Sequence, residues 1–132
     1  MPTVFTRIIN GELPGVFVWE DDQCVAFLSI GPLTPGHVLV VPRAEVDHWI
    51  DLDVETNQHL IAVAQRIARA VDQVYRPEKV GLMIAGLEVP HVHMHVVPMN
   101  GIHDLDFANA KTAAPEVLEA EAVRIRAALT DN

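Results

Sequence analysis

Polar and apolar side chains alternate strictly over residues 91–96. The alternating residues are His91, Val92, His93, Met94, His95 and Val96. A period of two is typical of a β-strand, because successive side chains of a strand point to opposite faces. The pattern predicts a strand over residues 91–97, ended by Pro98, with three imidazoles on one face and the aliphatic side chains on the other.

Shorter β-rich runs predict four more strands, over residues 16–19, 24–30, 37–41 and 80–85. Asp21 and Asp22 separate the first two runs, which is typical of a hairpin. Pro42 ends the third run, since proline cannot continue a ladder of hydrogen bonds. Near the amino terminus, Thr3 can cap a short helix over residues 5–9.

Apolar residues at helical spacing predict a long helix over residues 51–75. They are Leu60, Ala64, Ile67, Val71 and Val74. A final helix is predicted from Pro115, a residue suited to a first helical turn. Because short turns link most of the strands, the order of elements favours an α+β fold, with a five-stranded antiparallel sheet and the helices packed on one side.

The chain has 132 residues, of which 50% are hydrophobic and 20% charged, as expected for a single globular domain. Its formal net charge of −9 disfavours nucleic acid and anionic membranes as partners, because those are bound by clustered lysine and arginine. Cys24 is the only cysteine, so no intrachain disulfide can form, and we expect a small core residue. The amino terminus shows no basic segment followed by an apolar one, so we expect a cytoplasmic protein.

The histidine row has side chains suited to proton transfer, nucleophilic attack or metal binding. Along a strand, side chains two residues apart lie about 6.6 Å apart and those four residues apart about 13 Å. Two neighbouring imidazoles could therefore hold one zinc ion, with Zn–N distances of about 2.0–2.1 Å, but three from a regular strand could not. The alternative is a nucleophile, His93, with an imidazole on each side to stabilise charge or to protonate a leaving group.

Residues 86–98 resemble the signature of the histidine triad (HIT) family of nucleotide hydrolases and transferases, His-φ-His-φ-His-φ-φ, where φ is hydrophobic. The form Gly-Leu-Glu-Val-Pro before the histidines is similar to a bacterial sub-branch of that family. Earlier segments resemble the family's first helix and strands in the same order; they are residues 4–14, 20–22, 26–28 and 35–42. The resemblance covers residues 4–107.

The resemblance implies one HIT-like domain over residues 1–132, with a core at 4–107 and a carboxy-terminal helical segment at 108–132. It also implies a homodimer whose two sheets join into one ten-stranded sheet. A purine nucleotide or nucleoside phosphoramidate would be the substrate, and no metal or other cofactor is expected. The segment from Asn100 leaves room for a crossing to the pocket of the partner subunit.

By the same resemblance, four histidines would carry the reaction. His93 matches the nucleophile, which forms a covalent nucleotidyl-histidine at the α-phosphorus of a nucleoside phosphoramidate or nucleoside polyphosphate. His95 matches the residue that contacts the phosphate and assists the leaving group. His91 matches the residue that orients His93, and His37, from a neighbouring strand, matches a fourth histidine that supports the triad.

The nucleotide-binding residues that the resemblance implies are mostly apolar, as stacking against a purine requires. They are Phe5, Ile8, Leu13, Phe27, Ser29, Ile30 and Glu88. Ser29 stands where the family often has a ribose-binding aspartate, and Leu87 stands where it often has a phosphate-binding glutamine. The zinc-binding Cys-x-x-Cys of some members is matched by Thr3 and Thr6, so we expect no zinc there.

These observations lead to three hypotheses. The first is a metal-independent nucleotidyl hydrolase or transferase of the HIT type, phosphoramidase-like, that uses His93. The second is a purine-nucleotide-binding module with little turnover, suggested by Ser29 and Leu87. The third is a metal hydrolase built on the histidine row. Outside the row, His48 and His59 are interpreted as solvated or partly buried surface residues.

Overall fold

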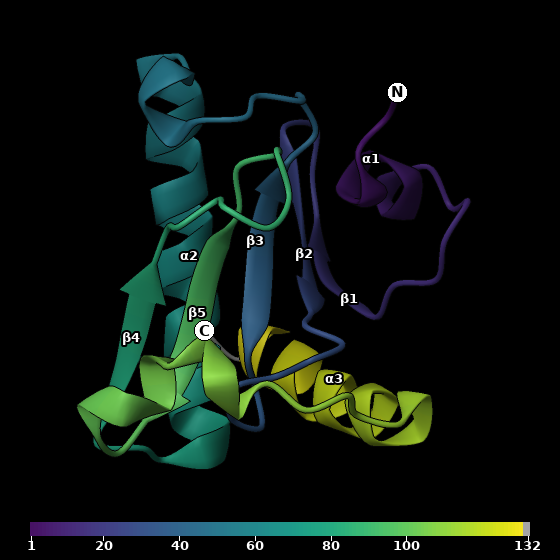
Figure 1. Cartoon of the computed structure of the whole chain (residues 1–132). Helices are drawn as coiled ribbons and strands as arrows, with labels where there is room; N and C mark the ends of the chain where they lie inside the picture. The colour runs from purple at the N-terminus through teal and green to yellow at the C-terminus, as the bar shows by residue number, and fades with distance from the viewer. Residues whose placement is uncertain (131–132) are drawn as a thin grey trace.

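Five strands form one antiparallel sheet in the computed structural model, which describes residues 1–130 (Figure 1). The strands lie side by side in the order β1-β2-β3-β5-β4, and each neighbouring pair is antiparallel. Their bounds are Phe17–Glu20 for β1, Cys24–Leu28 for β2, Val38–Pro42 for β3, Lys79–Met83 for β4 and Met94–Met99 for β5. The predicted α+β fold with a five-stranded antiparallel sheet is confirmed.

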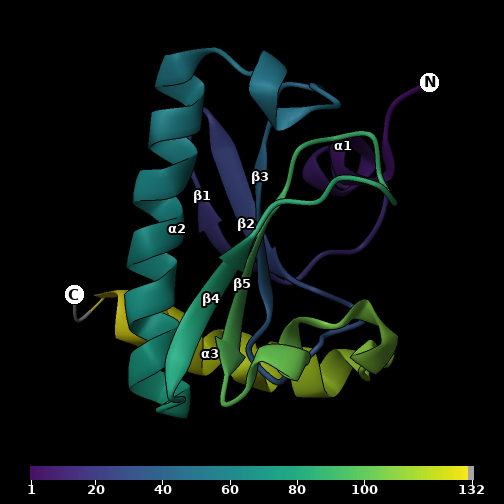
Figure 2. The same ribbon diagram turned by 60° about the vertical axis from the view of Figure 1, so that its left-hand side comes forward.

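Helices α1 and α2 cover opposite faces of this sheet, as Figures 1 and 2 show together. The bounds of the helices are Val4–Ile9 for α1, Val54–Tyr75 for α2 and Pro115–Thr130 for α3. The prediction that all helices pack on one side of the sheet is therefore wrong, because α1 lies on the second face. Strands β2 and β3 are buried along their whole length, so both faces of the sheet centre need cover, and α1 supplies part of it.

Alternate residues of β2 and β3 belong to two hydrophobic clusters, one on each face of the sheet. The smaller cluster, on the α1 face, consists of Phe5, Val25, Phe27, Leu39 and Val41. The larger cluster, on the α2 face, takes the intervening residues of these strands together with Met94, Val96 and the buried stripe of α2. The sheet thus separates the main core from a face that only a short helix covers.

Strand β5 begins three residues later than predicted and runs through Pro98. The N–H groups of His91 and Val92 donate to carbonyls of loop residues outside the ladder, which delays the start of the strand. Strand β3 pairs with β5 only over residues 94–96. Pro98 lies beyond that ladder, so its missing N–H leaves no β3 carbonyl without a donor.

The long helix starts later than the predicted residue 51, after a separate 3-10 turn at Trp49–Asp51. Asp53 caps α2 by accepting a hydrogen bond from the N–H of Thr56, a role for which aspartate is a preferred residue. The predicted apolar stripe is buried at Leu60, Ala64, Ile67 and Val71. The stripe therefore faces the sheet, as its spacing indicates.

Helix α3 begins at Pro115, as predicted. Two 3-10 turns, Ile102–Leu105 and Phe107–Asn109, lie between β5 and this helix. Of the predicted helical segment 108–132, residues 131–132 lie outside the described residues. Among the helices of residues 1–130, none is long and apolar enough to cross a membrane.

Candidate active site

The three histidines of the row lie on the α1 face of the sheet, as the alternation predicts. Their aliphatic neighbours pack in the larger cluster on the opposite face: Val92, Met94 and Val96. The exposed fractions of His91, His93 and His95 are only 0%, 5% and 6%. Buried imidazoles need hydrogen-bond partners, and those partners determine which nitrogen of each ring carries the proton.

His93 has an unprotonated ring nitrogen that is free to react. Its Nδ1 lies 2.8 Å from the carbonyl oxygen of His91, and because a carbonyl only accepts, Nδ1 carries the proton. In a neutral imidazole this leaves the lone pair on Nε2. The ring of Phe5 packs edge-on against His93, with 4.8 Å between the centroids. His93 is therefore held in the tautomer that a nucleophile requires.

His37 and His95 form a series of hydrogen bonds that begins at a main-chain N–H group. The N–H of Leu33 donates to Nδ1 of His37 across 3.0 Å, so the proton of neutral His37 is on Nε2. That Nε2 lies 2.9 Å from Nδ1 of His95 and donates to it. The proton of His95 is therefore on Nε2, a buried nitrogen without a hydrogen-bond partner in residues 1–130. The series of hydrogen bonds therefore ends at the Nε2–H group of His95, an unpaired donor beside His93.

The loop before β3 holds His37 in place through contacts to distant elements. The N–H of Gly36 donates to Glu121 of α3 across 3.0 Å, and the hydroxyl of Thr34 donates to the carbonyl of Pro98 across 2.7 Å. Gly36 has a φ of 92°, and a Cβ there would lie 2.5 Å from the ring of Tyr75. Glycine is therefore required both by the backbone conformation and by the close approach of α2.

His91 is tied to the amino-terminal helix. Its Nε2–H donates to the carbonyl of Pro42 across 2.7 Å, and its Nδ1 accepts from the hydroxyl of Thr3 across 2.6 Å. Thr3 also caps α1, and its N–H donates to the carboxylate of Glu45. Because both ring nitrogens of His91 are occupied, this imidazole links α1 to the sheet, and it is the main-chain carbonyl of His91 that contacts His93.

Burial keeps the histidines of the site neutral at physiological pH. Burial, followed by the charge of His93, lowers the pKa of His37 to about 4. Burial, followed by the charges of His37 and His93, lowers the pKa of His95 to about 3. Burial also lowers the pKa of His91 and of His93, although hydrogen bonds to main-chain carbonyls act in the opposite direction. The proton positions assigned above to these histidines require neutral imidazole rings.

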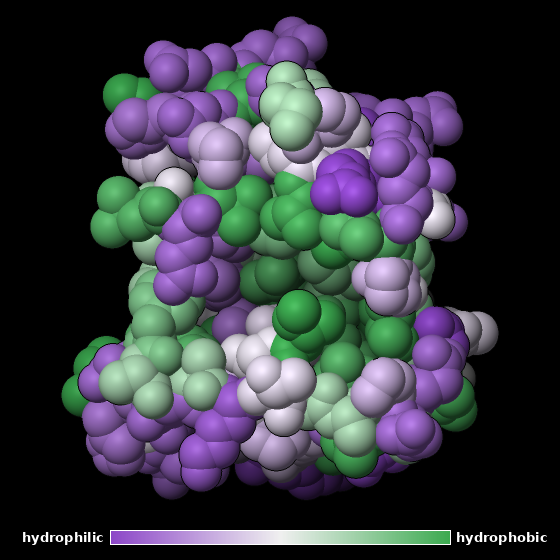
Figure 3. All heavy atoms as spheres, turned by 45° about the vertical axis from the view of Figure 1, so that its right-hand side comes forward, coloured by the Kyte–Doolittle hydropathy of each residue, from purple (hydrophilic) through white to green (hydrophobic). Residues whose placement is uncertain are grey.

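A pocket of about 520 Å³ opens beside His93 and His95. All seven residues predicted to bind the nucleotide line it: Phe5, Ile8, Leu13, Phe27, Ser29, Ile30 and Glu88. Figure 3 shows hydrophobic residues gathered around a hollow on the side of the molecule that carries α1. His37 lines the same pocket, whereas His91 lies behind it. The volume is that of a small-molecule site.

Sequence reasoning missed two parts of the site. Phe107 and Ala110, from the segment after β5, line the pocket of their own chain, and the Phe107 ring packs edge-on against His95 with 5.2 Å between centroids. An aromatic residue in a polar loop is the one signal that could have indicated Phe107. The link from Thr3 and Glu45 to His91 has no local sequence signature. Leu87 is 95% exposed and does not line the pocket.

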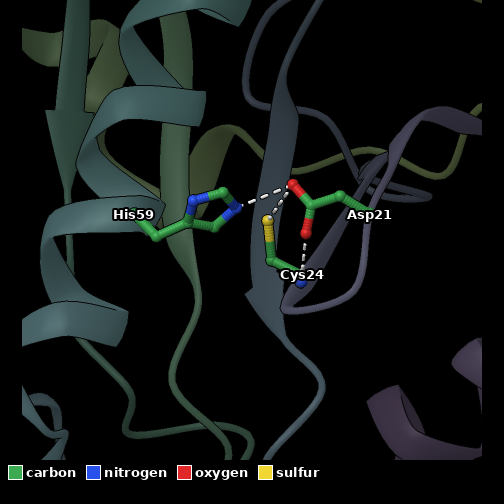
Figure 4. A group of neighbouring side chains, drawn as sticks. All are labelled: Asp21, Cys24 and His59. Atoms are coloured by element: carbon green, nitrogen blue, oxygen red, sulfur yellow. Dashed lines mark hydrogen bonds and ion pairs between the residues drawn. The ribbon is translucent and has the colours of Figure 1, made fainter.

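Three side chains of types that can bind a metal ion also meet at the β1–β2 turn: Asp21, Cys24 and His59 (Figure 4). Oδ2 of Asp21 accepts hydrogen bonds from Nε2 of His59 and Nε1 of Trp19, each across 2.7 Å. Burial raises the pKa of Asp21, but its hydrogen bonds outweigh burial and hold that pKa well below its usual range. Burial, followed by the charge of Asp21, raises the pKa of the Cys24 thiol to about 12, which opposes formation of a metal-binding thiolate. We interpret the cluster as structural: its hydrogen bonds link the β1–β2 turn to α2.

Comparison with known proteins relates the chain to one protein family. Residues 10–102 match the HIT domain. The chain is 38% identical to an uncharacterized HIT-like protein of Borreliella burgdorferi over 102 residues, which are 72% of this chain and 73% of that protein. The matched residues include His37 and all three histidines of the row.

Two solved structures have the same fold over almost the whole chain. A Hit-like protein from Bartonella henselae, described as involved in cell-cycle regulation, has a TM-score of 0.86 at 36% identity, with 96% of this chain and 95% of that chain covered. A hypothetical histidine triad nucleotide-binding protein from Sulfolobus tokodaii has a TM-score of 0.85 at 26% identity, with 96% and 91% covered. The histidine row, the domain match and these structures together show that the chain belongs to the HIT, or histidine triad, family.

Proposed function

We propose that the protein is a metal-independent nucleotidyl hydrolase or transferase, with Nε2 of His93 as its nucleophile. The observation that carries the proposal is the hydrogen bond from Nδ1 of His93 to the His91 carbonyl, which leaves the Nε2 lone pair free beside the pocket. The unpaired Nε2–H of His95 is on a ring centred 4.8 Å from that of His93. A nucleophile beside a hydrogen-bond donor suits attack on phosphorus, because the phosphate oxygens gain charge that the donor stabilises.

The proposed ligand is a purine nucleoside monophosphate unit. Apolar side chains such as Phe5, Ile8 and Phe27 form walls against which a flat base can pack. The Ser29 hydroxyl accepts from the N–H of Gly31 across 3.3 Å and keeps its own hydrogen for a ribose oxygen. The Sulfolobus tokodaii relative is described as nucleotide-binding, which is consistent with this ligand.

In the proposed reaction, Nε2 of His93 forms a bond to the α-phosphorus while the bond from phosphorus to the leaving group breaks. The leaving nitrogen or oxygen keeps the electron pair of the broken bond and takes a proton from water. The His93 ring becomes cationic, so its hydrogen bond to the His91 carbonyl strengthens. The Nε2–H of His95 donates to a phosphate oxygen. Water then cleaves the nucleotidyl-histidine, which releases the nucleotide and restores His93.

We further propose that the protein acts as a homodimer in the cytoplasm. Strand β4 is an edge of the five-stranded sheet, so pairing of two β4 strands would give one sheet of ten strands. Leu82 of β4 and Ile61 of α2 are exposed apolar residues that border one groove, and a partner subunit would cover them. Light scattering during size-exclusion chromatography tests the dimer, and a monomeric mass at micromolar concentration would contradict it.

The direct test is the release of AMP from an adenosine 5′-phosphoramidate in the presence of EDTA. The proposal expects release by the wild-type protein and none by His93→Ala. Activity that is lost in EDTA and restored by zinc would instead support a metal hydrolase built on the histidine row. Tight binding of AMP without turnover would support the binding module suggested by Ser29 and Leu87, which replace the family's usual aspartate and glutamine.

A second test is mass spectrometry of protein quenched during turnover. The proposal expects an acid-labile nucleotidyl adduct on His93, since a phosphorus–nitrogen bond to imidazole is the intermediate. An equal adduct in the His93→Ala variant would exclude His93 as the nucleophile.

A further inference from the structure

Glu88 is the one charged side chain among the described residues that line the site pocket. Lysine and arginine are absent from that lining within residues 1–130. The histidines of the lining are neutral, because burial lowers their pKa. The pocket therefore carries a single negative charge. Sites that hold several phosphate groups compensate their charge with cationic side chains, and the described residues of this pocket supply none.

Glu88 lines the same pocket as the proposed nucleophile, His93. It follows the Gly86 turn and precedes the histidine row, and its side chain is exposed at the pocket. Burial lowers the pKa of His93, while the hydrogen bond to the His91 carbonyl and then the charge of Glu88 act in the opposite direction. Within residues 1–130 Glu88 forms no ion pair. An exposed carboxylate without an ion-pair partner is available to a cationic group of a ligand.

The proposed binding mode brings the leaving group to this carboxylate. The base would pack against the apolar walls, and the α-phosphorus would lie at His93. The group attached to phosphorus must then extend toward solvent, because the inner part of the pocket is occupied by the nucleoside. Glu88 is exposed and lines the pocket, and the proposed binding mode places it on that open side.

We propose that Glu88 selects leaving groups that carry a positive charge, so that the preferred substrates are nucleoside 5′-phosphoramidates of diamines or of other amines with a second, cationic nitrogen. This inference rests on the proposed function and names its substrate class. Nucleoside polyphosphates are poor substrates by the same reasoning, because their leaving group brings further negative charge to Glu88.

The reaction needs no additional reactant beyond water. The bond from Nε2 of His93 to phosphorus forms as the phosphorus–nitrogen bond breaks, and the departing nitrogen keeps the electron pair and takes a proton from water. The second, cationic nitrogen stays protonated throughout and interacts with Glu88. Hydrolysis of the nucleotidyl-histidine then yields the nucleoside monophosphate and the free diamine.

Three adenosine 5′-phosphoramidates of similar length test the selection by charge. Their amines are 1,3-diaminopropane, 3-aminopropanol and β-alanine, which place a cation, a neutral hydroxyl or an anion at the same distance from phosphorus. One unit charge about 6 Å from the carboxylate changes the rate about threefold in water, so kcat/KM should differ about tenfold between the cationic and anionic substrates. The difference should shrink in 0.5 M NaCl, which screens exposed charges.

Variants at Glu88 decide whether this residue is responsible. Glu88→Gln keeps the size of the side chain and should reduce the ratio of kcat/KM between cationic and anionic substrates to near one. Glu88→Lys should invert the order. Glu78→Gln is the matched control, since Glu78 is also exposed but does not line the pocket, and it should keep the wild-type ratio.

The outcomes separate the two proposals. Turnover of all three substrates with a ratio that Glu88→Gln leaves unchanged would overturn the role of Glu88 and leave the nucleotidyl mechanism standing. If the wild-type protein released AMP from none of the three substrates, the proposed mechanism would be overturned, and the substrate class with it. A cation preference that disappears in Glu88→Gln and persists in Glu78→Gln would support both.

Discussion

The two faces of the stretch 91–96 are almost equally buried, yet only one of them forms a site. On the α2 face, Met94 is fully buried and belongs to the larger hydrophobic cluster. On the α1 face, His93 has 5% of its surface exposed, and its Nδ1 is bonded to a main-chain carbonyl. Burial alone therefore does not separate core from site. The difference is that each buried histidine has a defined tautomer. Within residues 1–130, one ring nitrogen of His93 and one of His95 have no hydrogen-bond partner, and both rings line a pocket.

The covering elements explain why the pocket is on one face only. Helix α2, with 22 residues, covers its side of the sheet along its length, and α3 packs beside it. Helix α1 has six residues and covers only one end of the opposite side. The remaining space is bordered by loops and by Phe107, and it becomes the pocket of about 520 Å³. A short helix on an apolar sheet face thus leaves room for a ligand where a long helix would not.

The strongest expected contrast is the loss of activity in His93→Ala. Removing the proposed covalent nucleophile should lower kcat by about 10³-fold or more, while the fold is retained because the ring borders a pocket. AMP release and the circular dichroism melting curve are the two measurements. Residual kcat within tenfold of the wild type would show that the two faces do not differ as described.

Met94→Ala should show the opposite behaviour. Truncating a fully buried methionine should lower the free energy of unfolding by about 2–5 kcal/mol. The kcat/KM of the folded protein, measured at low temperature, should stay within a few-fold of wild type, because Met94 faces α2. A variant that melts like the wild type but has lost activity would refute the assignment of the two faces.

The stability of the protein should fall as the pH decreases below about 6.5. The pKa of His37 is about 4 in the folded state, below its ordinary value of 6.5, so the unfolded chain binds more protons between these values. The contribution of His37 is fully present above pH 6.5 and is lost toward pH 4, which lowers the free energy of unfolding by on the order of 3 kcal/mol for a pKa shift of this size. Urea denaturation at pH 7.0 and pH 4.5 measures the loss.

Met94→Ala is the control for this pH dependence. It removes only apolar contacts, so it should lower stability equally at both pH values. His37→Gln should reduce the pH dependence by the His37 contribution, while the part due to His91, His93 and His95, whose pKa values burial also lowers, remains. An equal pH slope in the wild type and in His37→Gln would mean that other groups are responsible.

The smallest expected effect concerns the link between α1 and His91. Thr3→Val removes the hydroxyl that caps α1 and donates to His91, and should lower the free energy of unfolding by about 1–3 kcal/mol. It should also lower kcat, since α1 carries Phe5, which packs on His93. Thr3→Ser keeps the hydroxyl and should restore both quantities. Equal effects of Val and Ser would show that the hydrogen bond does not matter.

Much of the site could be predicted from the sequence because its residues follow local patterns. Alternation assigned His93 and Met94 to opposite faces, and the family resemblance of residues 35–42 placed His37 with the row. The residues predicted to bind the nucleotide line one pocket, although their role in binding remains a proposal. The predicted start of β5 was wrong, because the N–H of Val92 donates to a loop carbonyl and not to a neighbouring strand. No local sequence pattern indicates a contact of that kind.

The sequence by itself determined the periodicities, and through them the strands, the helices and the face on which each histidine lies. Tertiary structure alone decided the chemistry of each ring. The proton positions depend on the N–H of Leu33 and on the carbonyls of Pro42 and His91. Main-chain groups are the same in every residue, so a sequence cannot say which of them will face a given imidazole. Only the fold places them at hydrogen-bond distance and thereby decides which nitrogen is free to react.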